Sequence, residues 1–542
     1  MHVLHQSALA SMLVLLVLAP EWSVATASSQ TPADTTRRDS SAVVLEELLV
    51  RVGRPVATAG GASAVSVRLD LTRTPPAPTL DQALRNVPFV QVRTNSRGEA
   101  QLSLRGAEAR QVAVLVDGVP LSLGWDGRAD LAGIPVGGAG HITLVRGLSS
   151  VLHGPNVLGG VVEVDVSHGS STEREEEPLR ARAGLDHLGG HAFGATAALP
   201  VHTARGELGI RGGAGFRSRP GVAGFGELRE NSDLRHVDGF VSGRYVDRTR
   251  GWAALSAFAS RAERGVPPEL HLSRPRFWRY PEASRSLLAL SSGTGQRQTP
   301  LGRGDLEASL GVDLGRTEIQ SFRGRDYQQV VGRELADDRT LTLRLLGDHT
   351  LGQWAGLRTA ATLADVRHDE VLDPGGSARY RQRLWSLGSE IAAPLPGGGR
   401  VSGGLALDAA DTPESGDKPP LGRLAAWGGR LGANVPLGES VLLHAAASRR
   451  ARFPSLRELY SGALGRFVPN PELRPERLLA GEAGMTARIG ALELQAVAFH
   501  QRLADAIVRV SAGDSRFRRE NRDQLRSTGL ELLASGGWRG AS

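Results

Sequence analysis

Two histidines in this sequence have a spacing that could bind a metal ion. His187 and His191 are four positions apart, which in a helix would bring both imidazoles to one face. They lie in a glycine-rich stretch with the character of a turn, where helical geometry does not apply. We therefore predict no metal site from them.

The chain also lacks the patterns of common catalytic sites. Its single lysine, Lys418, follows an aspartate, whereas a phosphate-binding loop needs a Gly-Lys pair followed by Ser or Thr. Neither an H-E-x-x-H sequence nor a nucleophile elbow occurs. Because there is no cysteine, disulfides, thiolate metal sites and thiol nucleophiles are excluded. The sequence thus predicts no enzyme and no cofactor.

Composition narrows the class of protein further. The net charge of +7 over 542 residues comes almost entirely from arginine, and acidic residues are scattered among the arginines. No basic stripe with interleaved aromatic residues is present, so we do not expect nucleic-acid binding. The 68 glycines and the absence of a long apolar run, which would need about 18 residues or more, exclude a bundle of membrane helices.

The N-terminus predicts export. Residues 8–19 (ALASMLVLLVLA) form an apolar run too short to span a bilayer, and a small-x-small cleavage pattern ends at Ala27. We expect a signal peptide over residues 1–27, although its first residues contain no Lys or Arg. A buried core helix is the alternative, but the polar, Ser- and Thr-rich segment that follows argues against it. Residues 28–78 are expected to be a disordered linker.

Within this linker, residues 43–52 (VVLEELLVRV) form an isolated apolar and acidic segment. Two interpretations stay open. The segment is either the first strand of the next domain or an extended peptide that pairs with the sheet edge of a partner protein.

A small α+β domain is predicted over residues 79–170. A short helix is expected to start at Leu80, and three strand-and-turn signals follow at 102–106, 112–118 and 141–147. Each signal ends in a glycine, which can take the positive φ of a sharp turn. The residues expected to allow tight turns and close backbone approach are Gly106, Asp117, Gly118, Gly147, Gly154, Gly159 and Gly160.

Residues 178–542 have a different sequence pattern. Small or apolar residues alternate with polar ones at period two, as in residues 306–314 (LEASLGVDL). No repeat of blade length is present, which argues against a β-propeller. Weak alternating segments of about ten residues, separated by short turns and longer loops, are typical of transmembrane antiparallel β-barrels. The predicted fold is therefore mainly β, a barrel preceded by a small domain.

Several ordered motifs make the chain resemble the TonB-dependent outer-membrane receptors. In the small domain these motifs are LRG at 104–106, VLVDGVPL at 114–121 and ITLVRGLSSVLHGPNVLGGVVEV at 142–164. In the barrel they are residues 449–475 (RRARFPSLRELYSGALGRFVPNPELRP) and GLE at 529–531. The resemblance implies that residues 79–170 form a plug domain inside the lumen of a barrel of the 22-stranded type, about 22 strands being usual in such transporters.

The resemblance also implies a function. The chain would be a monomer in the lipid of a Gram-negative outer membrane, where it takes up a large, scarce solute with energy from an inner-membrane, TonB-like protein. Residues 43–52 resemble the segment that binds this partner. The coupling residues would be Glu46, Glu47, Leu48, Leu49, Val50 and Val52.

The sequence says less about which solute is transported. Iron-siderophore complexes are the commonest cargo of the resembling family, and cobalamin is the next candidate. Haem is disfavoured because residues 455–468 lack the histidine that haem receptors of this type usually carry there. A passive porin or an adhesin-like barrel is the alternative, although an open pore has no use for a plug.

Two arginines of the predicted plug require partners. Arg105 and Arg146 each follow a β run and are expected to lie against the barrel wall. A guanidinium buried there needs a carboxylate, because its desolvation costs several kcal/mol. By family motif, the partners are Glu482 and Glu531 in the barrel wall. We call these four residues the plug–barrel lock.

Two plug loops are expected to face the ligand. They are residues 93–99 and 122–128. The candidate ligand-facing residues are Arg93, Asn95, Arg97 and Trp125. Trp125 is equally compatible with a packing role inside the plug, because large aromatic side chains are usually mostly buried.

The C-terminal part departs from the family pattern. The last residues, LELLASGGWRGAS, do not form an amphipathic strand that ends in an aromatic residue. About 16 or 17 alternating segments follow residue 178, fewer than the roughly 22 strands of plugged transporters. We therefore expect a truncated barrel that lacks about five or six strands. With only 5% aromatic residues, the interfacial girdles are expected to be thin or partly replaced by Arg and Leu.

Overall fold

The computed structural model describes residues 64–67, 75–139, 141–147, 150–166, 178–224, 227–273, 275–462, 467–513 and 516–536. The predicted signal peptide, 1–27, and the predicted coupling segment, 43–52, lie outside the described residues. None of the described helices is long and apolar enough to cross a membrane.

The plug contains a five-stranded sheet with the order β1-β6-β7-β4-β5 and a separate β2-β3 hairpin. In the sheet, β4 and β7 are parallel, and the other neighbours are antiparallel. The plug elements are β1 (Ala64–Val67), α2 (Leu80–Leu84), β2 (Val90–Thr94), β3 (Ala100–Leu104), η1 (Ala109–Gln111), β4 (Val112–Val116), β5 (Val119–Leu121), η2 (Leu131–Gly133), β6 (His141–Arg146), η3 (Val151–His153) and β7 (Gly160–Asp165).

Strand β1 corrects the prediction that residues 28–78 are entirely linker. Ala64 pairs with Val145 and Val67 pairs with Ile142, so the plug sheet begins before residue 79. The four residues of β1 are too few to give a period-two signal of their own. They become a strand because the edge of β6 offers unpaired backbone groups, a contact that a local sequence pattern does not reveal.

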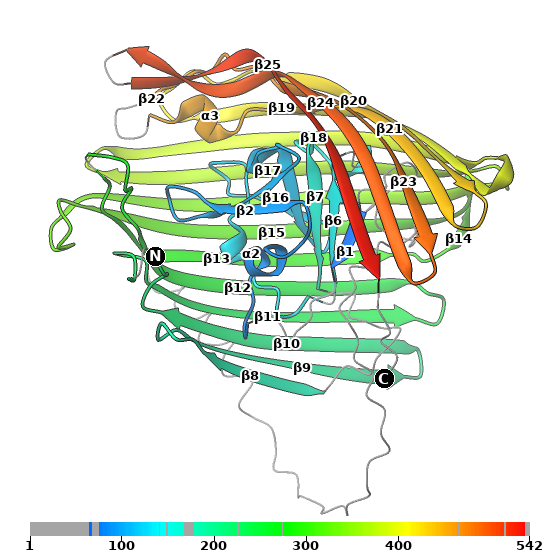
Figure 1. The fold of residues 1–542 in the computed structure, drawn as a ribbon, viewed down its shortest axis with the longest axis horizontal. Helices are drawn as coiled ribbons and strands as arrows, with labels where there is room; N and C mark the ends of the chain where they lie inside the picture. The colour runs from blue at the N-terminus through cyan, green and yellow to red at the C-terminus, as the bar shows by residue number, and fades with distance from the viewer. Residues whose placement is uncertain are drawn as a thin grey trace, which may run out of the picture. The chain divides into compact units, whose positions relative to one another are not determined.

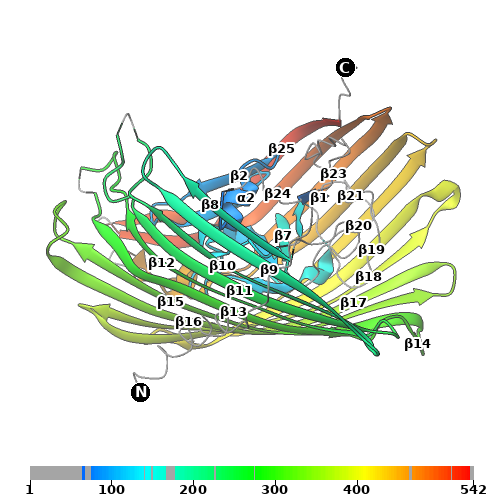
Figure 2. The same ribbon diagram turned by 90° about the horizontal axis from the view of Figure 1, so that it is seen from below.

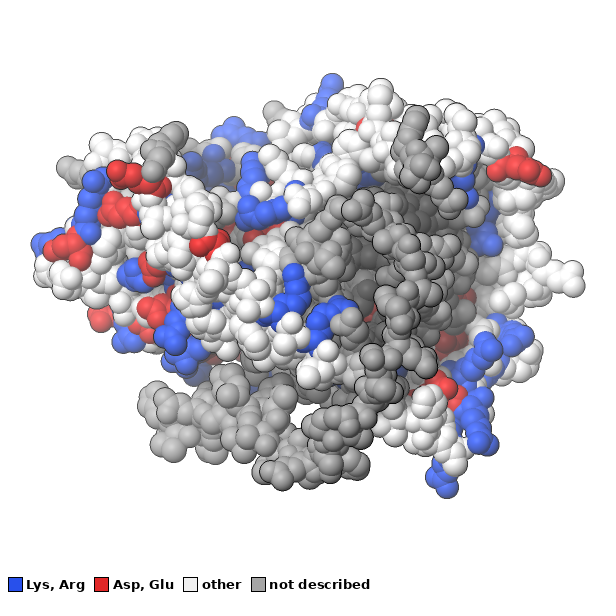
Figure 3. All heavy atoms as spheres, turned by 60° about the horizontal axis from the view of Figure 1, so that its bottom comes forward, with Lys and Arg blue, Asp and Glu red and all other residues white. Residues whose placement is uncertain are grey.

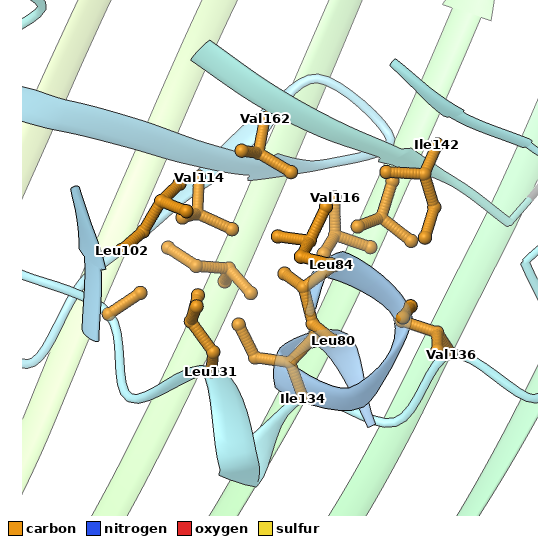
Figure 4. Packing of buried hydrophobic residues seen from close by; sticks show 14 of the residues in the cluster. Leu80, Leu84, Leu102, Val114, Val116, Leu131, Ile134, Val136, Ile142 and Val162 are labelled. Atoms are coloured by element: carbon orange, nitrogen blue, oxygen red, sulfur yellow. The ribbon is translucent and has the colours of Figure 1, made fainter. Parts of the chain in front are cut away.

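Helix α2 covers one side of the plug sheet. The backbone N–H of Thr79 donates to Gln82 Oε1 at 3.2 Å, a contact of the capping box that starts the helix. Leu80 and Leu84 are four residues apart and therefore share the face that packs on the sheet. Both are fully buried. Figure 4 shows these leucines among side chains from β3, β4, β6 and β7.

The barrel elements follow residue 178. They are β8 (Leu179–Leu185), β9 (His191–Thr203), β10 (Gly206–Arg219), β11 (Leu234–Asp247), β12 (Trp252–Val266), β13 (Trp278–Gly293), β14 (Arg297–Thr299), β15 (Gly302–Phe322), β16 (Val330–Leu351), β17 (Ala355–Asp373), β18 (Gly376–Pro394), η4 (Pro396–Gly398), β19 (Arg400–Ser415), β20 (Leu424–Leu437), β21 (Val441–Arg452), α3 (Leu456–Tyr460), β22 (Phe467–Val468), β23 (Glu476–Ile489), β24 (Leu492–Gly513) and β25 (Arg516–Gly536).

These strands form one barrel sheet in which long neighbours pair in chain order and β25 is followed by β8 and β9. Apart from the short β14 and β22, sixteen strands of seven to 22 residues are described. This number agrees with the estimate of about 16 or 17 strands. The prediction of a mainly β barrel with an α+β plug is confirmed, and Figures 1 and 2 show the plug strands inside the curve of the barrel strands.

Side chains of the barrel alternate between lumen and outer face. On β19, Ala406 and Asp408 are 6% and 0% exposed, whereas Leu405 and Leu407 are 68% and 60% exposed. The connections at one end of the barrel, such as 204–205 and 490–491, are short, and those at the other end, such as 453–475, are longer. Since outer-membrane barrels have short periplasmic turns and long external loops, the second end is the external one.

We expect Leu84→Ala to destabilise the plug by about 2–5 kcal/mol, because it leaves a cavity in a core that excludes water. Hydrogen exchange of the β4, β6 and β7 amides measures this loss as reduced protection. Leu532→Ala is the matched control, since Leu532 is 65% exposed on the outer face of β25. Equal protection in the two variants would contradict the assignment of Leu84 to the plug core.

Candidate functional site

Arg105 lies at the tip of the hairpin turn that follows β3. Leu104 and Ala107 exchange backbone hydrogen bonds of 3.3 and 2.7 Å across the two turn residues. Arg105 and Gly106 both have positive φ, 49° and 84°, as type I′ turns require. Positive φ is uncommon for a residue with a side chain, and it places this guanidinium at the extreme edge of the plug.

The Arg105 side chain joins the plug to two barrel strands. Its Nε and Nη2 donate to the two carboxylate oxygens of Glu531 on β25 at 2.9 and 2.7 Å. Its Nη1 donates to Glu482 on β23 at 2.6 Å. The guanidinium also lies 4.7 Å from the ring centre of Phe499. A bidentate contact of this kind is among the strongest hydrogen-bonding arrangements in proteins.

Arg146, the last residue of β6, reaches the same carboxylate. Its Nη1 donates to Glu531 Oε2 at 3.0 Å, and its guanidinium lies 4.8 Å from the ring centre of Phe89. The residue is fully buried. The structure therefore brings together all four residues of the predicted plug–barrel lock, and their charges cancel.

Burial opposes the charge of both guanidinium groups, with different outcomes. For Arg105, the hydrogen bonds to Glu531 and Glu482 outweigh burial, and its pKa is raised. For Arg146, burial outweighs the attraction of Glu531, and its pKa is lowered. Arginine is protonated at all physiological pH values, so both contacts are ion pairs near neutral pH.

Two predicted glycines allow the backbone to approach its neighbours closely. A Cβ on Gly147, whose φ is +82°, would lie 2.5 Å from Arg105 Nη1. A Cβ on Gly159 would lie 2.2 Å from the Cβ of Ala107. These two positions therefore require glycine for the lock and for the hairpin beside it. Among the predicted turn residues, positive φ is found at Gly106, Asp117, Gly118, Gly147, Gly154 and Gly160.

A second set of contacts between plug and wall was not predicted. Glu390 of β18 accepts hydrogen bonds from Ser150 Oγ at 2.7 Å and from the Val151 N–H at 2.8 Å. Arg344 of β16 donates to the Gly118 carbonyl at 3.0 Å. The alternation of β16 and β18 could have placed both charged residues in the lumen. Their partners are backbone groups and a serine, which give no distinctive sequence signal.

Trp125 packs against the barrel wall. Its ring is stacked on His368 of β17 with centres 4.6 Å apart and lies 4.8 Å from the ring of Tyr380 on β18. Its carbonyl accepts a hydrogen bond from the Arg457 N–H at 2.8 Å. Trp125 is thus a packing residue, but its partners belong to the barrel wall and not to the interior of the plug. These contacts also attach the loop 122–128 to the external half of the wall.

Asp126, next to Trp125, was not among the predicted residues. Its carboxylate accepts hydrogen bonds from Arg110 at 2.9 Å, from Arg128 at 2.6 Å and from Arg457 of α3 at 2.6 Å. Although burial alone would raise its pKa, Arg110, Arg457 and Arg128 hold the pKa of Asp126 well below its usual range. A single ionised carboxylate therefore fixes the outward-facing loop of the plug to a barrel loop.

The other predicted ligand-facing loop, 93–99, is held by contacts of its own with the barrel wall. Arg97 lies 3.4 Å from Glu334 of β16 and 5.7 Å from the ring centre of Trp278 on β13. Asn95 accepts a hydrogen bond from the Arg97 N–H at 2.8 Å, which shapes the turn. Arg93 is exposed. Of the two arginines, Arg93 is therefore available on the external side of the plug, whereas the Arg97 side chain is only 16% exposed and is ion-paired.

The motif at 449–475 and the glutamate after it form a network of buried charges. Arg452 donates to Glu458 of α3 at 2.8 and 3.0 Å and to Glu476 of β23 at 2.7 Å. Gln111 of the plug donates to the same Glu476 at 3.1 Å. Burial alone would raise the pKa of Glu458, but the neighbouring Arg452 and Arg110 lower this pKa to about 2. The network shapes the longest described external loop and ties it to the plug.

In the described part of the chain, no three His, Asp or Glu side chains come together in a way that could hold a metal ion. His187 lies in the turn between β8 and β9, and His191 is the first residue of β9. The predicted turn is therefore found at His187, whereas His191 already belongs to a strand.

A barrel whose lumen holds a folded plug defines a class of outer-membrane transport proteins. Residues 56–161 match the TonB-dependent receptor plug domain, and residues 233–542 match the TonB-dependent receptor-like β-barrel. The chain therefore belongs to the TonB-dependent receptor family, as the sequence motifs indicated. This family consists of receptors and transporters in the outer membrane of Gram-negative bacteria, which bind ligands and TonB-type partners.

Individual relatives are distant. A stretch of 89 residues is 34% identical to the vitamin B12 transporter BtuB of Photobacterium profundum and covers 16% of this chain and 15% of that protein. The copper transporter OprC is similar in structure, with a TM-score of 0.73 at 18% identity over 88% of this chain and 76% of that chain. The siderophore receptor PirA from Acinetobacter baumannii has a TM-score of 0.66 at 14% identity over 87% and 78%. At these low sequence identities, the structural similarity shows that the proteins share a fold.

Arg105→Ala should loosen the plug, because it leaves the carboxylates of Glu482 and Glu531 buried without their main cation. Breaking a buried pair from one side costs about 3–5 kcal/mol. We expect faster influx of a large antibiotic that the intact outer membrane excludes. Arg85→Ala is the control, since Arg85 is a plug arginine with an exposed side chain. Equal influx in the two variants would contradict a role of the lock in holding the plug.

Asp126→Asn should release the loop 122–128, because three arginines lose their shared carboxylate. We expect a local destabilisation of about 3–5 kcal/mol, measured as hydrogen exchange of the loop amides. Asp417→Asn is the control, because the Asp417 side chain is exposed and its ion pair with Lys418 lies at the surface.

The same loop should resist mild acid. The pKa of Asp126 is depressed in the folded state. The stability that Asp126 gives to the loop is therefore fully present above the ordinary aspartate pKa of about 3.9. This stability is lost as pH falls through the lower pKa of the folded state. After correction for intrinsic rates, exchange of the loop amides should therefore be equal at about pH 7 and about pH 5. Loss of protection in that interval would show that a group other than Asp126 controls the loop.

Proposed function

We propose that this chain is an energy-coupled receptor that imports a large, scarce solute across the outer membrane, with an iron-siderophore complex as the cargo. Cobalamin is the next candidate and haem a weaker one. A signal peptide cleaved near Ala27 would deliver the chain to the periplasm. The mature protein would act as a monomer surrounded by outer-membrane lipid.

The observation that carries this proposal is the ion-paired contact of the plug with the wall. Arg105 and Arg146 are buried against Glu482 and Glu531, so the plug cannot leave this wall without separating charges in a region of low dielectric. Passive diffusion of a large solute does not supply the free energy for such a step. An external energy source that acts on the plug does, and this favours active transport over a passive porin or an adhesin-like barrel.

The choice of cargo rests on the external side of the plug. Arg93 is exposed there and offers a cationic group, whereas Arg97 is paired with Glu334 and Glu99. An exposed guanidinium suits an anionic metal chelate. Since the similar proteins carry names for vitamin B12, copper and siderophores, the fold by itself is compatible with several cargoes.

The energy would enter through residues 43–52. We propose that Glu46, Glu47, Leu48, Leu49, Val50 and Val52 pair as an extended strand with a periplasmic TonB-like protein. Eleven residues separate Val52 from Ala64, the first residue of the plug strand β1. A pull on this segment would therefore reach β1 and, through its pairing with β6, the strand that ends at Arg146.

Leu48→Pro tests the coupling, because proline removes a backbone donor and prevents extended pairing at that position. We expect uptake of a labelled ferric siderophore to fall to the level seen with an uncoupler, while binding to whole cells is kept. Ala33→Pro, in the same predicted linker but outside the coupling segment, is the control and should leave uptake unchanged.

Normal uptake by the Leu48→Pro variant, or uptake that an uncoupler does not affect, would favour the passive channel. Binding and uncoupler-sensitive uptake of labelled cobalamin, without binding of ferric siderophores, would keep the mechanism and replace the cargo.

A further inference from the structure

The outer face of the last described strands carries a row of arginines. Arg449 of β21 is the cross-strand neighbour of Leu479 on β23, which is the neighbour of Arg502 on β24. Arg502 in turn is paired with Arg526 on β25. These positions lie at one level of four neighbouring strands that are about 4.8 Å apart. Three of the four, on β21, β24 and β25, are arginines, and the fourth is Leu479. We call Arg449, Arg502 and Arg526 the outer arginine row.

The row points away from the lumen. Gln501 and Leu503, which flank Arg502 along β24, are buried at 5% and 7% exposure, whereas Leu479 within the row is 57% exposed. Arg502 and Arg526 are both exposed. Because side chains alternate along a strand, the arginines lie on the face opposite to Glu482 and Glu531 of the lock.

The row marks a boundary on this outer face. Toward the periplasmic end of β24 the outward positions are apolar, and they include Leu494, Ala496 and Ala498. On β25 they include Leu530 and Leu532, both 65% exposed. Toward the external end the next outward position on β23 is another arginine, Arg477. An apolar band that ends in polar residues is where the hydrocarbon core of the membrane gives way to headgroups.

Several outward arginines elsewhere on the barrel have carboxylate partners. Arg383 lies 3.0 Å from Asp411, and Arg381 lies 2.6 Å from Asp365. On the face shown in Figure 3, blue and red side chains likewise lie next to one another along the rim. At Arg381 and Arg383 the positive charge is thus balanced by the protein itself.

The outer arginine row differs in this respect. Among the described residues, no carboxylate forms an ion pair with Arg449, Arg502 or Arg526; Asp505, further toward the external end, pairs with Arg474 and Arg477. Arg449 lies 4.0 Å from the ring centre of Trp427. Like charges directly opposite each other, as at the Arg502 and Arg526 positions, destabilise a sheet unless an anion lies between them.

We infer that the outer arginine row binds the phosphates of anionic lipid headgroups in the outer leaflet of the membrane. Arginine suits phosphate because its planar fork donates two hydrogen bonds to one group. A lipid fits this surface better than a free anion, because its acyl chains lie along the apolar band while its phosphates reach the row. The inference rests on the outer-membrane location and does not depend on the cargo.

The test uses the full chain purified in a neutral, phosphate-free detergent, with lipid A that carries two phosphates as the probe. The double variant R502Q/R526Q is expected to bind this lipid at least tenfold more weakly than the parent protein. R383Q, which removes an outward arginine already paired with Asp411, is the matched control and should bind within twofold of the parent. Heat-modifiable mobility in electrophoresis checks that both variants are folded.

Two further arms use the unmodified protein, so the inference stays testable if the double variant fails to fold. Lipid A without phosphates should bind at least tenfold more weakly than the phosphorylated form, and the affinity for the phosphorylated form should fall as salt rises. Inorganic phosphate at millimolar concentration should not displace it. Equal binding of both lipids, or equal binding by R502Q/R526Q and R383Q, would overturn the inference. Displacement by inorganic phosphate would show that the row binds a free anion and not a lipid headgroup.

Discussion

The rest of this structure depends on the pairing of buried charge between plug and wall. A guanidinium in the lumen is costly unless a carboxylate meets it, and Arg105 reaches two carboxylates from neighbouring barrel strands. This requirement explains the strained turn that presents Arg105 and the missing side chain at Gly147 beside it. It also explains why the barrel places Glu482 and Glu531 on inward positions of their strands, β23 and β25.

The plug meets the barrel wall through both apolar and polar contacts. Beside β11 to β13, Phe240, Phe258 and Leu287 join the hydrophobic core of the plug, and Arg264 of β12 lies 3.3 Å from Asp130. Beside β17 and β19, Val151 and Leu152 pack against Ala360 and Ala406, next to the hydrogen bonds of Glu390. Apolar contacts tolerate small slides, whereas charged contacts have defined partners. The charged and hydrogen-bonded contacts therefore determine the register of the plug in the lumen.

The sequence predicted those parts of the fold that have a period or a motif. Strand alternation predicted the barrel and nearly the correct number of strands, and family motifs predicted the four residues that meet in the lock. The strand β1 was missed because four residues carry no period, and Glu390 was missed because its partners are a serine and a backbone N–H. For Trp125 the sequence left two interpretations, ligand contact or packing inside the plug. The structure shows a third arrangement, packing on His368 and Tyr380 of the barrel, which depends on strands far along the chain.

The position of Glu531 also has a consequence for the order in which the chain folds. The hydrogen bond from Arg105 to Glu531 closes a loop of 426 residues. Contacts of such high sequence separation form late, because the entropy of closing the loop must be overcome before they contribute stability. Strand β25 has to be synthesised and paired before Arg105 finds its carboxylate. The plug, although made first, is therefore expected to be seated last.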